Sequence, residues 1–266
     1  MLKKLFALSL CLLLVIPACA APNWTYPLYI KELNSDLNRL VNRDHLLGEK
    51  DIPEDLVDVK LRKASSVTIF ARQAAADAAA KLFAAAAEEG LTLYLKSGYR
   101  SYQTQETMYR NRLEKNKGKD DALVAYPGAS EHQTGLALDV VNAEYAAAAR
   151  MNAGFYDSKE GKWLEANCAR FGFVIRYAKD KEDITKIKYE PWHIRYVGAN
   201  IANYMTEQNL CHEEFTEQWQ AVFEQYKSEG GSFETAMQYE NLAKAPEINE
   251  QELDNGDTEI SINFHQ

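Results

Sequence analysis

The chain has 266 residues, of which 46% are hydrophobic and 26% charged, a composition typical of a globular protein that excludes a wholly disordered chain. The 39 acidic residues outnumber the 30 basic ones, which gives a formal charge of −9. Because nucleic-acid binding needs a basic face, this balance argues against a nucleic-acid partner. The length is sufficient for one sizeable domain, with or without tails.

The first twenty residues have the pattern of an export signal. Lys3 and Lys4 precede an almost wholly apolar run over residues 5–16, and small residues follow it. A positive start, a short apolar run and an A-x-A cleavage pattern are typical of a secretory signal peptide, and the run is short for a membrane-spanning helix. We therefore predict that residues 1–20 are removed and that the protein works outside the cytoplasm.

The four cysteines leave two questions open. Residues 16–19, Ile-Pro-Ala-Cys, resemble a bacterial lipobox, in which Cys19 would carry a lipid and form the only membrane contact. Cleavage after Ala20 would instead release a soluble protein. Cys168 and Cys211 could pair in an oxidising compartment or remain two separate buried thiols.

Helices and strands are predicted in an irregular order along the chain. After a short linker over residues 21–30, one domain is predicted over 31–227. Helical patterns cover residues 31–41, 65–89, 102–115, 144–151, 163–170, 198–208 and 213–227. Strand patterns cover residues 91–95, 136–141, 173–177 and 184–189. This mixture favours an α+β fold over a doubly wound sheet.

The clearest helix is the alanine-rich stretch over residues 65–89. Alanine is the best helix former, and Gly90 stands where a glycine often ends a helix. By contrast, residues 228–266 are acidic and poorly periodic, so we predict a mostly flexible tail there.

The residues that could perform chemistry lie in three short segments, 97–101, 130–139 and 190–193. Asp139 stands within an apolar run, where a carboxylate is costly to bury unless it is paired or binds a metal. With His132 and His193 it would supply two histidines and one carboxylate to a zinc ion. That donor set leaves one open position for water, which is the catalytic arrangement.

Two further residues could assist such a metal. Glu190 lies three residues before His193, close enough to act as a general base on the attacking water without being a ligand. Arg100 could neutralise a developing oxyanion or hold a carboxylate. Taken singly, each residue also has a plain structural interpretation, such as a surface ion pair for the arginine.

Together the segments resemble one known family. The pattern S-x-H-x-x-G-x-A-x-D over residues 130–139, followed by E-x-x-H over 190–193, is similar to the zinc D-Ala-D-Ala carboxypeptidases and dipeptidases that act on bacterial cell-wall peptides. Ser-Gly-Tyr-Arg at 97–100 and Glu-Pro-Trp-His-x-Arg-Tyr-Val-Gly at 190–198 also match. The chain looks most like the VanY-like carboxypeptidases, whose branch includes L,D-carboxypeptidases. The resemblance covers residues 33–210 and not the acidic tail.

The resemblance implies a role for each matching residue. His132, Asp139 and His193 become the ligands of one zinc ion, Glu190 becomes the general base, and Arg100 lies near the scissile carbonyl or the terminal carboxylate. Substrate contacts are implied for Ser130, Gln105, Tyr99 and Trp192. The implied fold is α+β, with a small antiparallel sheet that carries the zinc and is flanked by helices, as in Hedgehog and the D,D-peptidases. Asp139 would end a central strand, and Glu190 and His193 would follow the strand at 184–189.

The expected activity is that of a secreted or lipid-anchored, monomeric zinc carboxypeptidase. It would remove the C-terminal D-alanine from peptidoglycan stem peptides, at either a D,D or an L,D bond. The alternatives are a D,D-dipeptidase or endopeptidase with the same chemistry, and a zinc-containing module that binds wall peptides without cleaving them. The export signal argues against a dipeptidase acting on cytoplasmic precursors, and Glu190 argues against a pure binding module.

Overall fold

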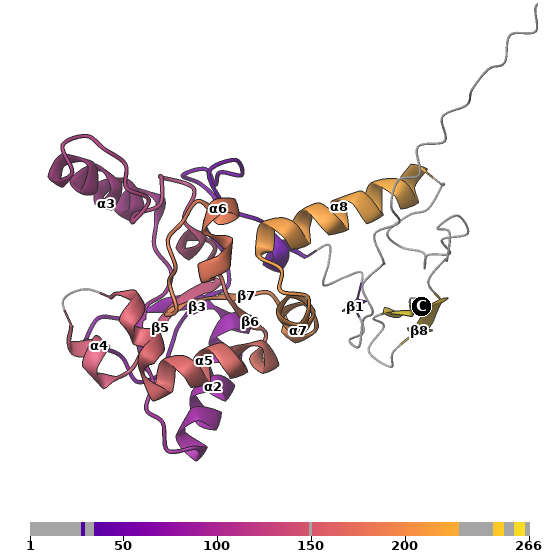
Figure 1. Ribbon diagram of the computed structural model, residues 1–266, viewed down its shortest axis with the longest axis horizontal. Coiled ribbons are helices and arrows are strands. Elements are labelled where there is room, and N and C mark those ends of the chain that lie inside the picture. Colours follow the sequence, from indigo (N-terminus) through magenta and orange to yellow (C-terminus); the bar gives the residue numbers. More distant parts are fainter. Residues whose placement is uncertain (1–27, 30–34, 149–150, 229–246, 253–257, 264–266) are drawn as a thin grey trace, which may run out of the picture.

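The computed structural model describes residues 28–29, 35–148, 151–228, 247–252 and 258–263 (Figure 1). The predicted signal peptide, with Cys19, lies outside these residues. Within the described part of the chain, no helix is both long enough and apolar enough to cross a membrane.

A four-stranded antiparallel sheet forms the centre of the domain. Its strands are β4 (Tyr94–Ser97), β5 (Ala137–Val141), β6 (Phe173–Ile175) and β7 (His193–Tyr196), in the order β4-β5-β7-β6. All five residues of β5 are buried, as expected for an inner strand covered on both faces. The predicted α+β class, with a small antiparallel sheet flanked by helices, is confirmed.

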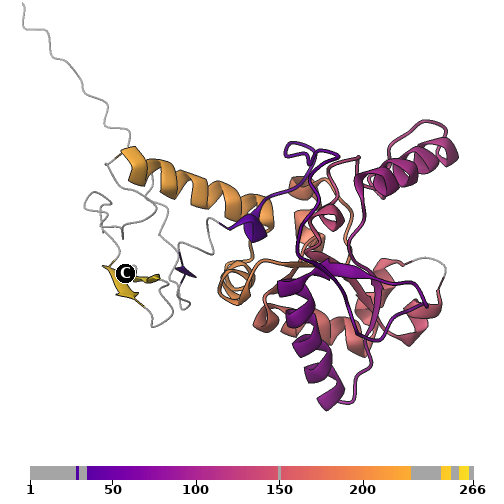
Figure 2. The same ribbon diagram turned by 180° about the vertical axis from the view of Figure 1, so that it is seen from behind.

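Helix α2 (Gln73–Glu88) supplies much of the core beneath the sheet. Its fully buried residues Ala75, Ala79, Leu82 and Ala86 recur at helical spacing, and the small alanine side chains let neighbouring elements approach closely. Helix α5 (Lys159–Asn167) lies beside α2 in both views and contributes to the same core (Figures 1 and 2).

A second core lies at the other end of the sheet. Helix α7 (Ala199–Glu207) and helix α8 (His212–Ser228) enclose Ile201, Met205, Phe215 and Trp219. From there α8 runs away from the sheet (Figure 1).

Shorter elements complete the structure. The other helices are α3 (Tyr102–Lys115), α4 (Ala143–Ala147) and α6 (Glu182–Thr185), and the 3-10 turns are η1 (Asp36–Asn38), η2 (Glu131–Thr134), η3 (Ala153–Asp157), η4 (Cys168–Phe171) and η5 (Lys179–Lys181). Strands β2 (Leu56–Asp58) and β3 (Phe70–Arg72) form an antiparallel pair, and β1 (Leu28–Tyr29), β8 (Glu247–Glu252) and β9 (Thr258–Asn263) form a separate sheet.

Two of the sequence predictions are wrong. Residues 31–41 were expected to form a helix, but their described part contains only the single turn η1. Residues 184–189 were expected to form a strand, but they hold the end of α6 and an irregular segment. There the Thr185 hydroxyl donates to the Lys181 carbonyl, and the Glu182 carboxylate accepts from the Tyr189 backbone N–H. These side chains satisfy the backbone locally, so no strand partner is needed.

Other boundaries shift by a few residues. The helix expected from residue 65 begins at Gln73, because residues 70–72 pair with β2 instead. Asp139 lies in the middle of β5 rather than at its end. The segment that we predicted as a flexible tail contains β8 and β9, whereas the domain boundaries at 31 and 228 stay predictions.

Cys168 and Cys211 are both buried free thiols. Burial raises the pKa of each thiol to about 12, so neither is a reactive thiolate at neutral pH. Of the two possibilities left open above, the unpaired one is found.

The close packing of α2 can be tested with neighbouring alanines. Ala79 is fully buried, and leucine there should lower the free energy of unfolding by about 1–3 kcal/mol because the core has no room for it. Ala80 is exposed on the same helix, so Ala80→Leu is the matched control and should be nearly neutral. Urea denaturation gives the free energy of unfolding of both variants, and an equal loss in the two would contradict the close packing around Ala79.

Candidate metal centre and active-site cleft

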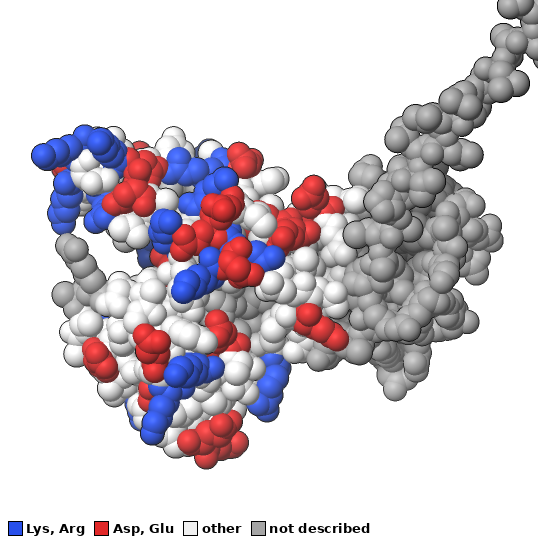
Figure 3. Space-filling view, viewed as in Figure 1, with Lys and Arg blue, Asp and Glu red and all other residues white. Residues whose placement is uncertain are grey.

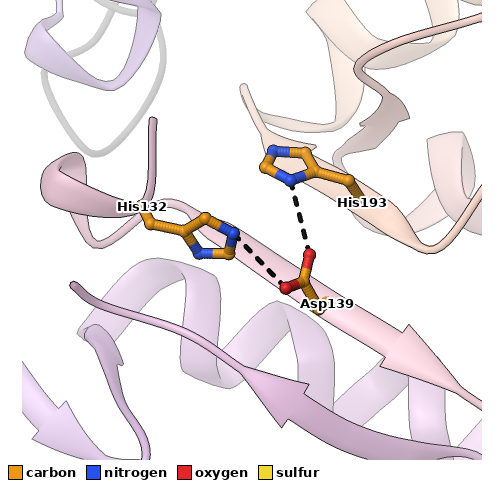
Figure 4. Close-up of side chains that lie close together, drawn as sticks. All are labelled: His132, Asp139 and His193. Carbon is orange, nitrogen blue, oxygen red and sulfur yellow. Dashed lines mark ion pairs between the residues drawn. The ribbon is translucent and has the colours of Figure 1, made fainter. Parts of the chain in front are cut away.

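The structure brings His132, Asp139 and His193 together (Figure 4). One potential ligand atom from each lies within 4.8 Å of the others, and all three residues are buried. His132 Nε2 is 3.5 Å from Asp139 Oδ2, and His193 Nδ1 is 3.4 Å from Asp139 Oδ1. The candidate metal site therefore presents Nε2 of one imidazole, Nδ1 of the other and both carboxylate oxygens.

Strand pairing accounts for two of the three positions. Asp139 is the direct partner of His193 in the β5–β7 register. Directly paired residues place their side chains on the same face of a sheet, about 5 Å apart. His132 reaches this face from η2, the turn just before β5.

A backbone carbonyl orients His132. Its Nδ1 lies 2.7 Å from the Gly98 carbonyl oxygen. Since a carbonyl can only accept, Nδ1 carries the proton and Nε2 presents its lone pair toward Asp139. A side chain at Gly98 would place its Cβ 2.4 Å from the Phe70 carbonyl oxygen, which explains why glycine stands there.

The three side chains fit a cation. Asp139 Oδ1, on the ligand side of the cluster, is buried and has no hydrogen-bond partner among the described residues, a costly arrangement without a ligand. Burial opposes the charged form of Asp139, but the two histidines outweigh it and hold its pKa below the usual range. Burial alone would lower the pKa of His193, but the nearby carboxylates of Asp139 and Glu131 outweigh burial and raise that pKa to about 9. Two imidazoles with one carboxylate are a donor set suited to a catalytic zinc ion with an open position.

Glu190 stands at the edge of this cluster. Its Oε2 lies 3.7 Å from His193 Nδ1. Burial raises the pKa of Glu190 to about 7, with a further upward contribution from Asp139, against the opposing charges of His193 and Arg100. A carboxyl group with a pKa near neutrality can both accept and return a proton.

Arg100 is held over the site by Gln105. Arg100 Nη1 donates to Gln105 Oε1 at 2.8 Å, and Gln105 Nε2 donates to the Ala125 carbonyl at 2.7 Å. The second bond fixes which end of the amide faces the guanidinium. Burial lowers the pKa of Arg100, while Asp139 and Glu190 oppose that shift.

A cleft of about 580 Å³ opens above the cluster. Arg100, Ser130, Trp192 and Glu190 are among the residues that line it. Two of the residues expected to contact substrate are placed elsewhere. Gln105 lies buried behind Arg100, and Tyr99 is not among the residues that line the cleft.

The rim of the cleft has a basic side. Arg112 and Lys115 of α3 line it, and Figure 3 shows Lys and Arg side chains gathered over the free end of that helix. Asp121 accepts hydrogen bonds from the Arg112 guanidinium and offsets part of this positive charge, so Lys115 is the rim residue that favours approach of an anionic ligand.

Two lining residues carried no signal in the sequence. The Tyr177 ring packs 4.8 Å from the His193 ring, measured between centroids, and also lines the cleft. Lys96 lines the cleft while its Nζ donates to the Tyr145 and Ala148 carbonyls. Neither lies in a recognisable motif, so only the three-dimensional packing identifies them.

Behind the candidate ligands lies a buried charge cluster that the sequence analysis missed. Glu131 Oε1 accepts from Arg176 Nε at 2.7 Å and from Arg195 Nη1 at 2.8 Å. Arg176 also donates to both oxygens of Glu213, at 2.6 and 2.8 Å. The position of Glu131 between Ser130 and His132 was the available clue.

Comparison with known proteins identifies the family. The family model described as VanY: D-alanyl-D-alanine carboxypeptidase matches residues 68–199. The bifunctional D-Ala-D-Ala dipeptidase and D-Ala-D-Ala carboxypeptidase VanXYC of Enterococcus gallinarum is 33% identical over 178 residues, 66% of this chain and 92% of that protein. The chain belongs to the VanY family.

Two other relatives are longer than the matched region. "Putative carboxypeptidase YodJ" of Bacillus subtilis (strain 168) is 42% identical over 67% of this chain, and a D-alanyl-D-alanine carboxypeptidase of Enterococcus faecium is 31% identical over 73% of it. The matches span 66% and 55% of those proteins, just under two thirds and about half of their lengths.

Solved structures of VanY relatives share the fold. The LdcB LD-carboxypeptidase has a TM-score of 0.62 and 41% identity, covering 67% of this chain and 84% of that one. A mutant of the vancomycin-resistance D,D-pentapeptidase VanY in complex with Zn(II) has a TM-score of 0.53 and 32% identity, covering 67% and 97%. A VanY relative thus binds zinc, the metal that the donor set here fits.

Zinc should stabilise this protein through Asp139. A ligand that binds only the folded state adds about 2.7 kcal/mol at a free concentration one hundred times its Kd. We expect the melting temperature of the wild type to rise on zinc addition and that of Asp139→Ala to gain much less, because one ligand is lost. Glu190→Gln is the control and should keep the gain. Thermal melting measures these shifts. An equal rise in melting temperature in the wild type and in Asp139→Ala would show that Asp139 is not a zinc ligand.

Proposed function

We propose that this protein is a zinc-dependent carboxypeptidase that removes the C-terminal D-alanine from peptidoglycan stem peptides. The observation that carries the proposal is the position of Glu190, whose Oε2 lies 3.7 Å from His193 Nδ1, beside a buried cluster of two histidines and Asp139. The family relationship supports the substrate class, since VanY relatives are named for D-Ala-D-Ala carboxypeptidase activity.

In this proposal His132, Asp139 and His193 hold one zinc ion. When bound, zinc supplies a Lewis acid that polarises the scissile carbonyl and acidifies water. Glu190 takes the proton of the attacking water on its carboxylate and returns it to the leaving amine. These steps break the peptide bond with one water consumed and no net proton change.

Arg100 and the cleft residues orient the peptide. The Arg100 guanidinium, fixed by Gln105, faces the oxyanion or the terminal carboxylate of the substrate. Ser130 would donate to that terminal carboxylate, and Trp192 would form a wall of the pocket. Tyr99 does not line the cleft, and its backbone N–H donates to the Phe70 carbonyl, which holds the Gly98–Arg100 segment in place.

The proposal places the protein outside the cytoplasm, where its substrate lies. The signal-like sequence over residues 1–20 supports export, either as a secreted protein or with a lipid on Cys19.

A second function deserves a test because one relative is bifunctional. VanXYC is named as both a dipeptidase and a carboxypeptidase. A dipeptidase needs a closed pocket that admits only two residues, whereas the cleft here has a volume of about 580 Å³ and room for a longer peptide. The open cleft favours the carboxypeptidase.

Glu190→Gln tests the chemistry. The amide keeps the size of the side chain but cannot accept a proton, so kcat should fall by about 10²–10⁴-fold while zinc stays bound. Turnover is measured on a defined pentapeptide, and zinc content by elemental analysis of the same sample. Full turnover by the zinc-loaded variant would show that another group moves the proton.

Mass spectrometry of defined muropeptides identifies the bond. The protein should remove one alanine from a pentapeptide (D,D bond) or a tetrapeptide (L,D bond), and a chelator should stop the reaction until zinc is restored. Free D-Ala-D-Ala is the control substrate, and its cleavage alone would indicate a dipeptidase. No cleavage by the zinc-loaded protein would favour an endopeptidase or a wall-peptide-binding module.

A further inference from the structure

Glu131 lies behind His193, on the side away from the cleft. It is fully buried, and two guanidinium groups occupy its Oε1. Its Oε2 has no hydrogen-bond partner among the described residues and lies 3.8 Å from His193 Nε2. His193 Nε2 is itself buried without a hydrogen bond there. Two complementary polar atoms thus face each other slightly beyond hydrogen-bond distance.

We propose that Glu131 is a positioning residue for His193. Its Oε2 accepts the Nε2–H proton and so fixes the tautomer in which Nδ1 presents its lone pair to the metal. This inference rests on the proposed zinc centre, but it concerns metal affinity and not hydrolysis.

The orientation of the His193 ring supports this role. Nδ1 faces the ligand side, at 3.4 Å from Asp139 Oδ1 and 3.7 Å from Glu190 Oε2. The opposite nitrogen therefore needs an acceptor behind the site. His132 already has one, because its Nδ1 donates to the Gly98 carbonyl. Ligating histidines commonly donate their second N–H to a carboxylate or carbonyl, which orients the ring and raises its basicity.

The arginines keep one oxygen of Glu131 free for this task. Arg176 and Arg195 both donate to Oε1, which leaves Oε2 without a hydrogen-bond donor among the described residues. Their charges stabilise Glu131 as a carboxylate in a buried position, where an unpaired anion would be too costly. A carboxylate held in this way is a stronger acceptor than a neutral group.

The competing explanation is that Glu131 only neutralises the two arginines. Glu213 offers a matched control, because it is bound to Arg176 by two hydrogen bonds in the same cluster. It also accepts a hydrogen bond from Asn42, and within the described part of the chain it has no hydrogen bond or ion pair with His132, Asp139 or His193. Glu131→Gln and Glu213→Gln therefore remove the same charge from the same network, one with contact to His193 and one without.

Zinc affinity separates the two explanations. Both variants should melt at lower temperature than the wild type. Competition with a chromophoric chelator should show zinc binding about 10–100-fold weaker in Glu131→Gln, the usual effect of losing an outer acceptor, and unchanged in Glu213→Gln. Wild-type affinity in Glu131→Gln, or equal losses in the two variants, would overturn the proposal.

The wild type provides a test that needs no variant. In the zinc-loaded protein labelled with ¹⁵N-histidine, the Nε2–H proton of His193 should be observed by NMR at the downfield shift of a hydrogen bond to a carboxylate. It should move upfield in Glu131→Gln and stay in place in Glu213→Gln. A crystal structure of the zinc-loaded wild type with Oε2 bonded to another donor would overturn the proposal even if Glu131→Gln fails to fold.

These readouts are distinct from hydrolysis. If the wild type binds zinc but the affinity and NMR results fail, only the role of Glu131 is wrong. If the wild type takes up no zinc, both this inference and the proposed function fail.

Discussion

The pairing of β5 with β7 is the contact on which the candidate site depends. It sets Asp139 opposite His193, so a carboxylate from one strand and an imidazole from the other meet on one face. A register slip of one residue would turn one of them to the opposite face, because side chains alternate along a strand. Gly135 ends η2 with a φ of 69°, in the left-handed region, and turns the chain into β5. This turn places His132 of η2 at the same face as Asp139 and His193.

The buried charges behind the sheet tie distant segments to this site. Arg195 donates to the Leu37 and Arg39 carbonyls as well as to Glu131. At the start of α8, His212 Nε2 lies 3.1 Å from the Asn38 carbonyl oxygen. Such bonds satisfy groups that would be costly to bury alone. The segment around η1 and the start of α8, far apart in sequence, therefore both belong to the support of the metal centre.

Features that depend on neighbouring residues could be predicted from the sequence, whereas features that depend on contacts between distant residues could not. The helices at 102–115 and 198–208 are predictable because their signals are local, and the structure has them at 102–115 and 199–207. The three candidate ligands are predictable because histidines and a carboxylate in an apolar run are conspicuous. The strand predicted at 184–189 was wrong because side-chain hydrogen bonds satisfy that segment. The pairing of Glu131 could not be predicted, since its partners Arg176 and Arg195 lie 45 and 64 residues away. Only the folded chain brings such groups together.

Two carboxyl groups flank His193 in opposite environments. Burial alone would raise the pKa of both. At Glu131 the charges of Arg176 and Arg195 outweigh burial and hold its pKa well below the usual range, whereas at Glu190 burial prevails and the pKa rises to about 7. One carboxylate thus stays an anion while the other can exchange a proton near neutral pH. Carboxyl groups separated in this way by their surroundings serve different roles, so the same imidazole is held from behind by a fixed charge and faces a proton carrier in the cleft.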